Sequence, residues 1–546
     1  MKIRVAVFAA LCWWLLSNSP ALAQGKHEHG RANLDKLGRV HFPISCNQIA
    51  QDQFDRAMAL QHSFWYEEAG KAFSAVINMD PNCSMAYWGV ALSYYHPLWE
   101  PPDKATLQKG WEALQKGKAV GFQTRREMDY IEALEQYYKD GDKLDHRTRA
   151  LAYEHAMEQL SNRYPDDVEA AILYALALDS TAPITDKSYT NQKKASAILE
   201  KIFKDQPDHP GIAHYIIHSN DSPLLASRGL DAARRYAKIA PSVPHALHMP
   251  SHIFTRLGLW DESVESNVAS ASAAEEYAAK NFKDATWDQE LHAMDYLMYG
   301  YLQNAEDRHA AELFDRVRAI RKVTPENLTS GFALAAMQAR YTLERRQWAE
   351  AAELTVGPAN FPWERVPIAR VIQSFAQAVG AVRSKDLAKA RTSIEQLELA
   401  RQQIITGNQT RWIGEAEILK KEATAWLTYA EGNSDAAIRM LREAIATEDS
   451  TEKHPVTPGS IIPAHEMLAD LFMELNRPAD ALKEFELALQ TTPYRFNSTY
   501  GAAKSALLTG DQQKAKKYFA QLLETCKKST SHRSELGEAT MFLAKR

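Results

Sequence analysis

The chain has 546 residues, of which 45% are apolar and 24% are charged, the balance of an ordinary soluble globular protein. A chain of this length contains either several domains or one elongated array of repeats. Its formal net charge of −5 and its pI of about 6.4 exclude a strongly basic surface. We therefore expect it to bind neither nucleic acid nor an anionic membrane surface.

Residues 1–23 have the pattern of a secretory signal peptide. Lys2 and Arg4 provide a basic start, and the apolar run over residues 5–16 is too short to span a bilayer. Ala-Leu-Ala at residues 21–23 is a small-x-small cleavage signature. An uncleaved N-terminal anchor is the alternative. The sequence thus predicts an exported protein of the periplasm or the extracellular space, with no membrane span after signal cleavage.

Three cysteines remain once the signal is removed, namely Cys46, Cys83 and Cys526. An odd number permits one disulfide, and Cys46 with Cys83 is the natural pair because both lie near the start of the mature chain. Three unpaired, buried thiols are the alternative.

Residues 24–50 begin with a polar, glycine-containing stretch and are expected to form a flexible lead-in, with His27 and His29 in a solvated tail. Over residues 51–546, apolar side chains recur at spacings of three and four between Asp-Pro, Gly-Asn and Gly-Asp turns. Strand signals are nearly absent. The sequence therefore predicts an all-α fold for residues 51–546.

Several segments share one layout of small residues, a turn, an aromatic and a proline. In residues 464–493, small Ala469 precedes a turn at Asn476, and a second helix carries Ala481 and Phe485 before Pro493. Similar patterns recur around Ala503, Ala515 and Phe519, around Ala425, Ala437 and Leu441, and around Ala57, Ala69 and Phe73. This spacing resembles the tetratricopeptide repeat and predicts a solenoid of stacked antiparallel helix hairpins. A closed α/α toroid is the alternative.

Histidines gather on three successive first helices of the predicted hairpins. His214 and His218 are four residues apart and share one helical face, as do His248 and His252. The candidate metal ligands are His214, His218, His245, His248, His252 and His292.

Because neighbouring helix axes lie about 8–10 Å apart, these imidazoles could meet at one ion. Three histidines with an open fourth place suit zinc, and copper accepts similar ligands. Asp221 and Asp295 are candidate acceptors that would fix the imidazole tautomers. The alternative is that each histidine is a packing residue bonded to a carbonyl oxygen.

An aromatic cluster near the start of the predicted array is a second candidate site. His62, Tyr66, Trp88 and His96 could form the wall of a ligand site, because tyrosine and tryptophan combine contact area with a polar tip. Aromatic packing between the first hairpins is the alternative. The long, proline-containing loop over residues 447–463 is a further functional candidate, whereas its flanking His454 and His465 are expected at the surface.

Four segments resemble a bacterial group of exported tetratricopeptide proteins, namely ALQHSFWYEEAGKAF, DPNCSMAYWGVALS, PHALHMPSHIFTRLGLWDE and KHPVTPG. The resemblance implies the repeat fold and brings no activity with it. Tetratricopeptide proteins in general are implied to be adaptors that hold a peptide or a protein partner in the concave groove. No carboxylate-clamp set of lysines and asparagines can be mapped onto this chain.

The first functional hypothesis is an exported solenoid that binds a protein, peptide or other ligand in its groove, with or without a metal at the histidines. A metal-dependent, hydrolase-like enzyme that uses the histidine cluster is the second hypothesis. A periplasmic metal-binding or storage protein is the third. The sequence has no phosphate loop, Rossmann fingerprint, Gly-x-Ser-x-Gly elbow or Cys-x-x-Cys pair, which argues against the enzyme classes that depend on them.

Overall fold

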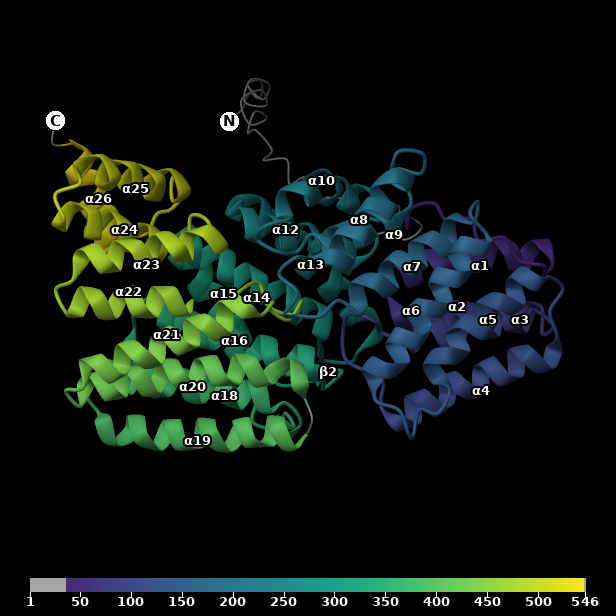
Figure 1. Ribbon diagram of the computed structural model, residues 1–546, viewed down its shortest axis with the longest axis horizontal. Coiled ribbons are helices and arrows are strands. Elements are labelled where there is room, and N and C mark those ends of the chain that lie inside the picture. Colours follow the sequence, from purple (N-terminus) through teal and green to yellow (C-terminus); the bar gives the residue numbers. More distant parts are fainter. Residues whose placement is uncertain (1–35, 408, 545–546) are drawn as a thin grey trace, which may run out of the picture. The chain divides into compact units, whose positions relative to one another are not determined.

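A computed structural model describes residues 36–407 and 409–544, and these residues are predominantly helical (Figure 1). The predicted signal peptide, together with His27 and His29, lies outside the described residues. The helices are α1 (Gln48–His62), α2 (Tyr66–Met79), α3 (Ser84–Ser93), α4 (Lys104–Val120), α5 (Arg125–Tyr138), α6 (His146–Arg163), α7 (Val168–Ser180), α8 (Thr190–Phe203), α9 (Pro210–Ser219), α10 (Leu230–Ile239), α11 (Pro244–His248), α12 (Pro250–Leu257), α13 (Trp260–Asn281), α14 (Asp288–Gln303), α15 (Asp307–Ala319), α16 (Leu328–Glu344), α17 (Trp348–Ala352), α18 (Pro367–Arg383), α19 (Leu387–Thr406), α20 (Thr410–Ala430), α21 (Ser434–Ser450), α22 (Ala464–Glu474), α23 (Pro478–Thr491), α24 (Phe496–Leu508), α25 (Gln512–Thr525) and α26 (Ser534–Ala544).

Strand structure in the described part of the chain is confined to one short parallel pair. β1 (Thr286–Trp287) pairs with β2 (Val323–Thr324), and short 3-10 turns occur at Ala226–Gly229 and Trp363–Arg365. The prediction of an all-α fold is confirmed. No helix in residues 36–407 or 409–544 is long and apolar enough to cross a membrane.

The hairpin turns repeat one backbone conformation. A residue with positive φ stands two positions before the second helix of the hairpin, and the series is Phe64, Gly258, Ala305, Arg346, Lys385, Gly432, Asn476 and Gly510. The recurrence of this turn along the chain is what a solenoid of equivalent hairpins requires.

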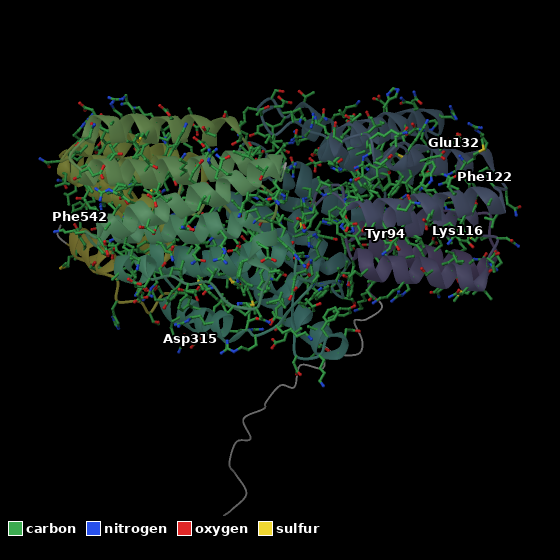
Figure 2. The ribbon with its side chains drawn as sticks, turned by 90° about the horizontal axis from the view of Figure 1, so that it is seen from below. Tyr94, Lys116, Phe122, Glu132, Asp315 and Phe542 are labelled. Atoms are coloured by element: carbon green, nitrogen blue, oxygen red, sulfur yellow. A yellow bond between two sulfur atoms is a disulfide. The ribbon has the colours of Figure 1, made fainter. Side chains whose placement is uncertain are left out.

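Successive hairpins pack through an aromatic side chain and a small residue, as the sequence pattern predicts. A Cβ atom at Gly501 of α24 would lie 2.3 Å from the ring of Phe485 on α23, and Gly89 of α3 has the same relation to Phe73 on α2. The second helices carry exposed outer faces, on which Lys116 of α4 and Asp315 of α15 lie at the surface (Figure 2).

The inner helices of the central hairpins are buried on all sides. Every residue of α9 and of α16 is buried, and nearly every residue of α14 is. A helix that is buried all round lies in the interior of a protein. The loop over residues 451–463 covers these helices, because Tyr296 of α14 donates a hydrogen bond to the carbonyl of Thr457 and Arg340 of α16 donates one to the carbonyl of Gly459. The concave face on which a partner was expected is therefore covered here by the chain itself.

Residues 24–50 were expected to form a flexible lead-in, but the part of this segment that the structure describes is packed against the first hairpins. Phe42 is fully buried and packs on Phe54, Trp88 and Tyr130, with ring centroids 5.4, 5.4 and 4.9 Å away. This aromatic anchor holds the segment before α1 on the first hairpins. The packed chain thus begins ahead of residue 51, the boundary that polarity alone indicated.

The predicted disulfide between Cys46 and Cys83 is present, and Cys526 is buried and unpaired among the described residues. The bond ties the start of α1 to the start of α3 across 37 residues. Closing a loop of this length should stabilise the protein by about 4 kcal/mol, mainly by restricting the unfolded chain. We expect Cys46→Ser/Cys83→Ser to lose that much free energy of unfolding in urea titrations. Reductant should destabilise the parent protein but leave the double variant unchanged, and equal stability of the two proteins would contradict the prediction.

Candidate metal centre

The six candidate histidines lie in one continuous cluster of imidazole rings. α9 carries His214 and His218, whereas α11, α12 and α14 carry the other four. Neighbouring ring centroids are 4.8 Å apart for His214–His218, 5.0 Å for His214–His245, 5.9 Å for His245–His248, 5.0 Å for His248–His252 and 4.2 Å for His248–His292. The short helix α11 ends at His248, and Pro250 starts α12. Because proline has no amide hydrogen, it cannot continue the hydrogen bonds of α11, so the two helices are separate.

The cluster divides into two groups of three rather than forming one six-ligand centre. We call His214, His218 and His245 the His214 triad, and His248, His252 and His292 the His248 triad. Within each triad, one nitrogen from each ring lies within 4.8 Å of the others. The sequence predicted that all six ligands could meet at one ion, whereas the structure has two separate groups, each of which could hold one ion.

In the His248 triad, two ring nitrogens face each other without a proton to share. The Nδ1–H of His248 donates to Oδ1 of Asn267 at 2.6 Å, and the amide of Asn267 is oriented by its own donation to the carbonyl of Ser263 at 2.7 Å. The Nδ1–H of His252 donates to Asp221 at 2.8 Å. Both Nε2 atoms of the neutral rings are therefore lone pairs, and they lie 3.0 Å apart.

The pKa values of the rings keep them neutral. Burial lowers the pKa of His248 and of His292 well below the usual value, and a neighbouring histidine lowers each further. Burial also lowers the pKa of His252, although Asp221 opposes the shift. Neutral imidazole is the form that binds a metal ion, so these rings need not lose a proton first.

His292 completes the triad without any hydrogen bond of its own. It is 1% exposed, and neither ring nitrogen has a hydrogen-bond partner among the described residues. A buried polar group without a partner costs about 1–3 kcal/mol. A cation between the three rings would give His292 a partner and would remove the opposition of the two Nε2 lone pairs.

The His214 triad is also positioned by a hydrogen bond, which His214 donates to a neighbouring main-chain oxygen. The Nδ1–H of His214 donates to the carbonyl oxygen of His62 at 2.7 Å, and its Nε2 lies 3.1 Å from Nε2 of His218. His245 is 6% exposed, and its Nε2 has no partner in the described part of the chain. Of the six histidines, only His214 is bonded to a main-chain oxygen in the way that the packing alternative required.

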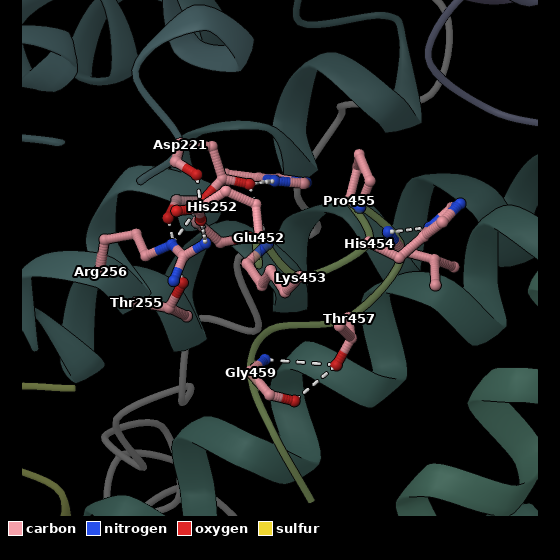
Figure 3. A network of polar contacts seen from close by, with 12 residues as sticks. Asp221, His252, Thr255, Arg256, Glu452, Lys453, His454, Pro455, Thr457 and Gly459 are labelled. Carbon is pink, nitrogen blue, oxygen red and sulfur yellow. Dashed lines mark hydrogen bonds and ion pairs between the residues drawn. The ribbon is translucent and has the colours of Figure 1, made fainter. Parts of the chain in front are cut away.

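Asp221 and Asp295 have different surroundings. Asp221 accepts hydrogen bonds from His252, from Arg256 at 2.9 Å and from Lys453 at 2.9 Å (Figure 3). Burial acts to raise the pKa of Asp221, but Lys453 and Arg256 outweigh it and hold the pKa well below the usual range. Asp295 has no hydrogen bond to any histidine among residues 36–407 and 409–544. Its neighbour is Arg340 at 3.5 Å, and burial raises its pKa to about 6.

The loop over residues 451–463 contacts the cluster through Lys453 and through the carbonyl of Thr457, which accepts a hydrogen bond from Tyr296 of α14. Lys453 is the loop residue that contacts Asp221, and burial lowers its pKa to about 8.

The prediction that His454 and His465 lie at the surface is wrong. Both are buried, because the ring of His454 stacks on Trp412 at a centroid distance of 4.7 Å and His465 bonds to Glu484 at 2.6 Å.

A pocket of about 200 Å³ leads toward the histidines. His245 lines it, and so do Glu67 and Asp288. The ring centroids of Phe64 and His214 are 4.3 Å apart and those of Trp99 and His292 are 5.4 Å apart, so these two side chains cover His214 and His292, whereas His245 itself lines the pocket. The aromatic side chains of the wall are Phe64, Trp65, Tyr66, His96, Trp99 and Trp287.

Two of the four predicted wall residues line this pocket. Tyr66 and His96 do, and their rings stack at a centroid distance of 4.1 Å. Trp88 and His62 are not among the described residues that line it. Trp88 is a core residue between Phe42 and Tyr130, because the first hairpins pack around it.

His62 belongs to a third group, which the sequence reasoning missed. Its Nε2 lies 2.8 Å from one oxygen of Glu169, and His209 lies 3.0 Å from the other. Tyr215 also contacts the His62 ring at 3.0 Å. The carboxylate of Glu169 lies between two imidazoles and is bonded to both, so it has hydrogen-bond partners without an ion, although Nδ1 of His209 has none among the described residues. No sequence spacing connects His62 with Glu169, because α1, α7 and α9 are distant in the chain.

Comparison with known proteins gives weak structural likeness. No family model matches the chain, and no curated protein matches it. Among solved structures, yeast Tom70 is 11% identical, with 91% of this chain and 95% of that chain covered at a TM-score of 0.35. A human IFIT1 dimer with m7Gppp-AAAA is 12% identical, covering 81% and 90% at 0.34, and Naa15/Naa10 bound to HypK-THB is 11% identical, covering 90% and 91% at 0.25. TM-scores this low carry no argument, so the all-α solenoid rests on the repeated hairpins of the chain itself.

Proposed function

We propose that this chain is a helical-repeat metalloprotein that binds a transition-metal ion at the His248 triad. The observation that carries the proposal is the pair of unprotonated Nε2 atoms of His248 and His252, 3.0 Å apart in a buried site. His292 supplies a third nitrogen with no other partner among the described residues. Imidazole ligands suit zinc and copper, and three histidines leave one coordination position open.

The ligand site of the array is proposed to be the pocket beside His245 rather than the concave groove. The loop over residues 451–463 covers the inner helices, whereas the pocket is lined by His245 of the His214 triad and by Trp99, whose ring lies beside His292 of the His248 triad. This placement supports a second candidate function, in which the ion acts on a small molecule bound in the pocket. A bound ion would supply Lewis-acid chemistry there, for example by activating a water molecule.

Export remains part of the proposal. The signal-peptide pattern of residues 1–23 supports it, and so does the disulfide between Cys46 and Cys83, because such bonds persist in oxidising compartments. The ion would then be acquired in the periplasm or outside the cell.

The test is elemental analysis of tag-free protein purified from a host that exports it. We expect at least one transition-metal ion per chain, and loss of the ion of the His248 triad in His248→Ala/His252→Ala. The matched control is His155→Ala, which removes an exposed histidine from α6 and should retain the ion. Circular dichroism should show that all three proteins are folded. Only trace metal in folded, exported parent protein would overturn the proposal.

A further inference from the structure

We infer that the His214 triad binds a second metal ion, so that the two triads form a paired centre. This inference rests on the proposed function of the His248 triad and extends it to a second site of the same kind. The two triads have the same construction. Each consists of a pair of histidines four residues apart and a third histidine from the first helix of the following hairpin. The His248 triad thus repeats the His214 triad, one hairpin further along the solenoid.

The donor atoms of the His214 triad are available for an ion. Because Nδ1 of His214 carries the proton that bonds the His62 carbonyl, its Nε2 is a lone pair. A proton on Nε2 of His218 would satisfy the 3.1 Å contact between these two rings, but it would leave Nε2 of His245 without a partner among the described residues. The ring of Phe64 packs against all three histidine rings. Because its side chain is apolar, it cannot accept or donate a hydrogen bond to them.

The two sites lie directly beside each other. His218 and His252 have ring centroids 5.7 Å apart, and His245 and His248 have centroids 5.9 Å apart, so each triad contacts the other through two pairs of rings. Metal–nitrogen bonds are about 2.0–2.1 Å long. Ions on the facing sides of these rings would be within reach of one small bridging ligand, the arrangement of two-metal sites.

The charge of the surroundings selects the class of that bridging ligand. Six neutral imidazoles bring no negative charge. Asp221 is already paired with Lys453 and Arg256, and Asp295 faces Arg340. Two divalent ions would therefore place about four uncompensated positive charges in a buried site, which is costly. A small anion between the ions, of the hydroxide class, would lower that charge, and the pocket beside His245 is its route from solvent.

The test is titration of metal-free protein with Cu²⁺, followed by electron paramagnetic resonance. We expect two Cu²⁺ ions per chain, with a spectrum whose intensity falls well below that of two isolated ions because the spins couple. Azide, a small anionic probe, should shift the spectrum. The variant His214→Ala/His218→Ala should bind one ion and recover the full intensity of an isolated centre, whereas His155→Ala should behave as the parent.

The outcomes separate the two proposals. One ion per chain, uncoupled and unaffected by His214→Ala/His218→Ala, would overturn the paired centre and leave the His248 triad standing. No ion at all would overturn both. The spectrum of the parent protein decides even if the double variant does not fold, since two bound ions without coupling would also contradict a shared bridge.

Discussion

Zinc should stabilise the parent protein against unfolding, and His292→Leu should remove the part of that stabilisation that comes from the His248 triad without weakening the metal-free protein. A ligand that binds only the folded state stabilises it by about 4 kcal/mol when its free concentration is a thousandfold its Kd. The metal-free protein should not suffer from the substitution, because the ring of His292 makes no hydrogen bond among the described residues. Leucine is apolar and similar in size, so it removes a ligand while leaving no polar group without a partner.

The measurement is a thermal or urea unfolding series at increasing free Zn²⁺, with chelator as the zero point. The matched control is His465→Leu, another buried histidine, which bonds Glu484 at 2.6 Å. That variant should lose stability in the absence of zinc and yet keep the full response to it. A response of equal size in His292→Leu and in the parent would show that zinc binds elsewhere.

The fold could be predicted from the sequence because every hairpin requires the same few residues. Phe485 and Gly501 illustrate the requirement, since the aromatic ring occupies the volume that a Cβ atom at Gly501 would need. Such contacts join neighbours in the chain, so they leave a periodic signal. The pairing of His214 with His218 and of His248 with His252 is predictable for the same reason, because residues four apart share a helical face.

The division into two triads could not be predicted, because it depends on one residue. His245 is three positions before His248, and their spacing places them on one face. In the structure its ring lies closer to His214, at 5.0 Å between centroids, than to His248, at 5.9 Å. Which triad His245 joins depends on how α11 packs against α9, and residue spacing within one helix carries no information about that packing.

Contacts between distant hairpins were equally out of reach. Lys453 meets Asp221 across 232 residues, and His62 meets Glu169 across 107. Such contacts depend on how the superhelix brings its distant turns together. The sequence marked residues 447–463 as a candidate loop by length and composition alone. Trp88 shows the opposite error, because a tryptophan that packs a core and one that lines a ligand site have the same local sequence pattern.

The second prediction with a large expected effect concerns Asp221, which bonds both His252 and Lys453. We expect Asp221→Asn to weaken zinc binding by about 10–100-fold, because the carboxylate that orients the His252 ring would be lost. The same change should destabilise the protein by about 3–5 kcal/mol, because Lys453 would remain buried without the carboxylate it bonds and Arg256 would keep only Glu452, at 3.7 Å. Zinc affinity from competition with a chromophoric chelator, together with urea unfolding in the absence of metal, measures the two effects separately.

A double variant tells orientation apart from general destabilisation. Asp221→Asn/Lys453→Met removes the buried ammonium group together with its partner, so it should recover part of the lost stability. It should not recover zinc affinity, because His252 would still lack the carboxylate that holds its Nδ1 proton and turns Nε2 toward His248. If zinc affinity returned along with stability, Asp221 would act only as a structural counter-ion. If Asp221→Asn bound zinc as tightly as the parent, the orientation of His252 by Asp221 would not contribute to the site.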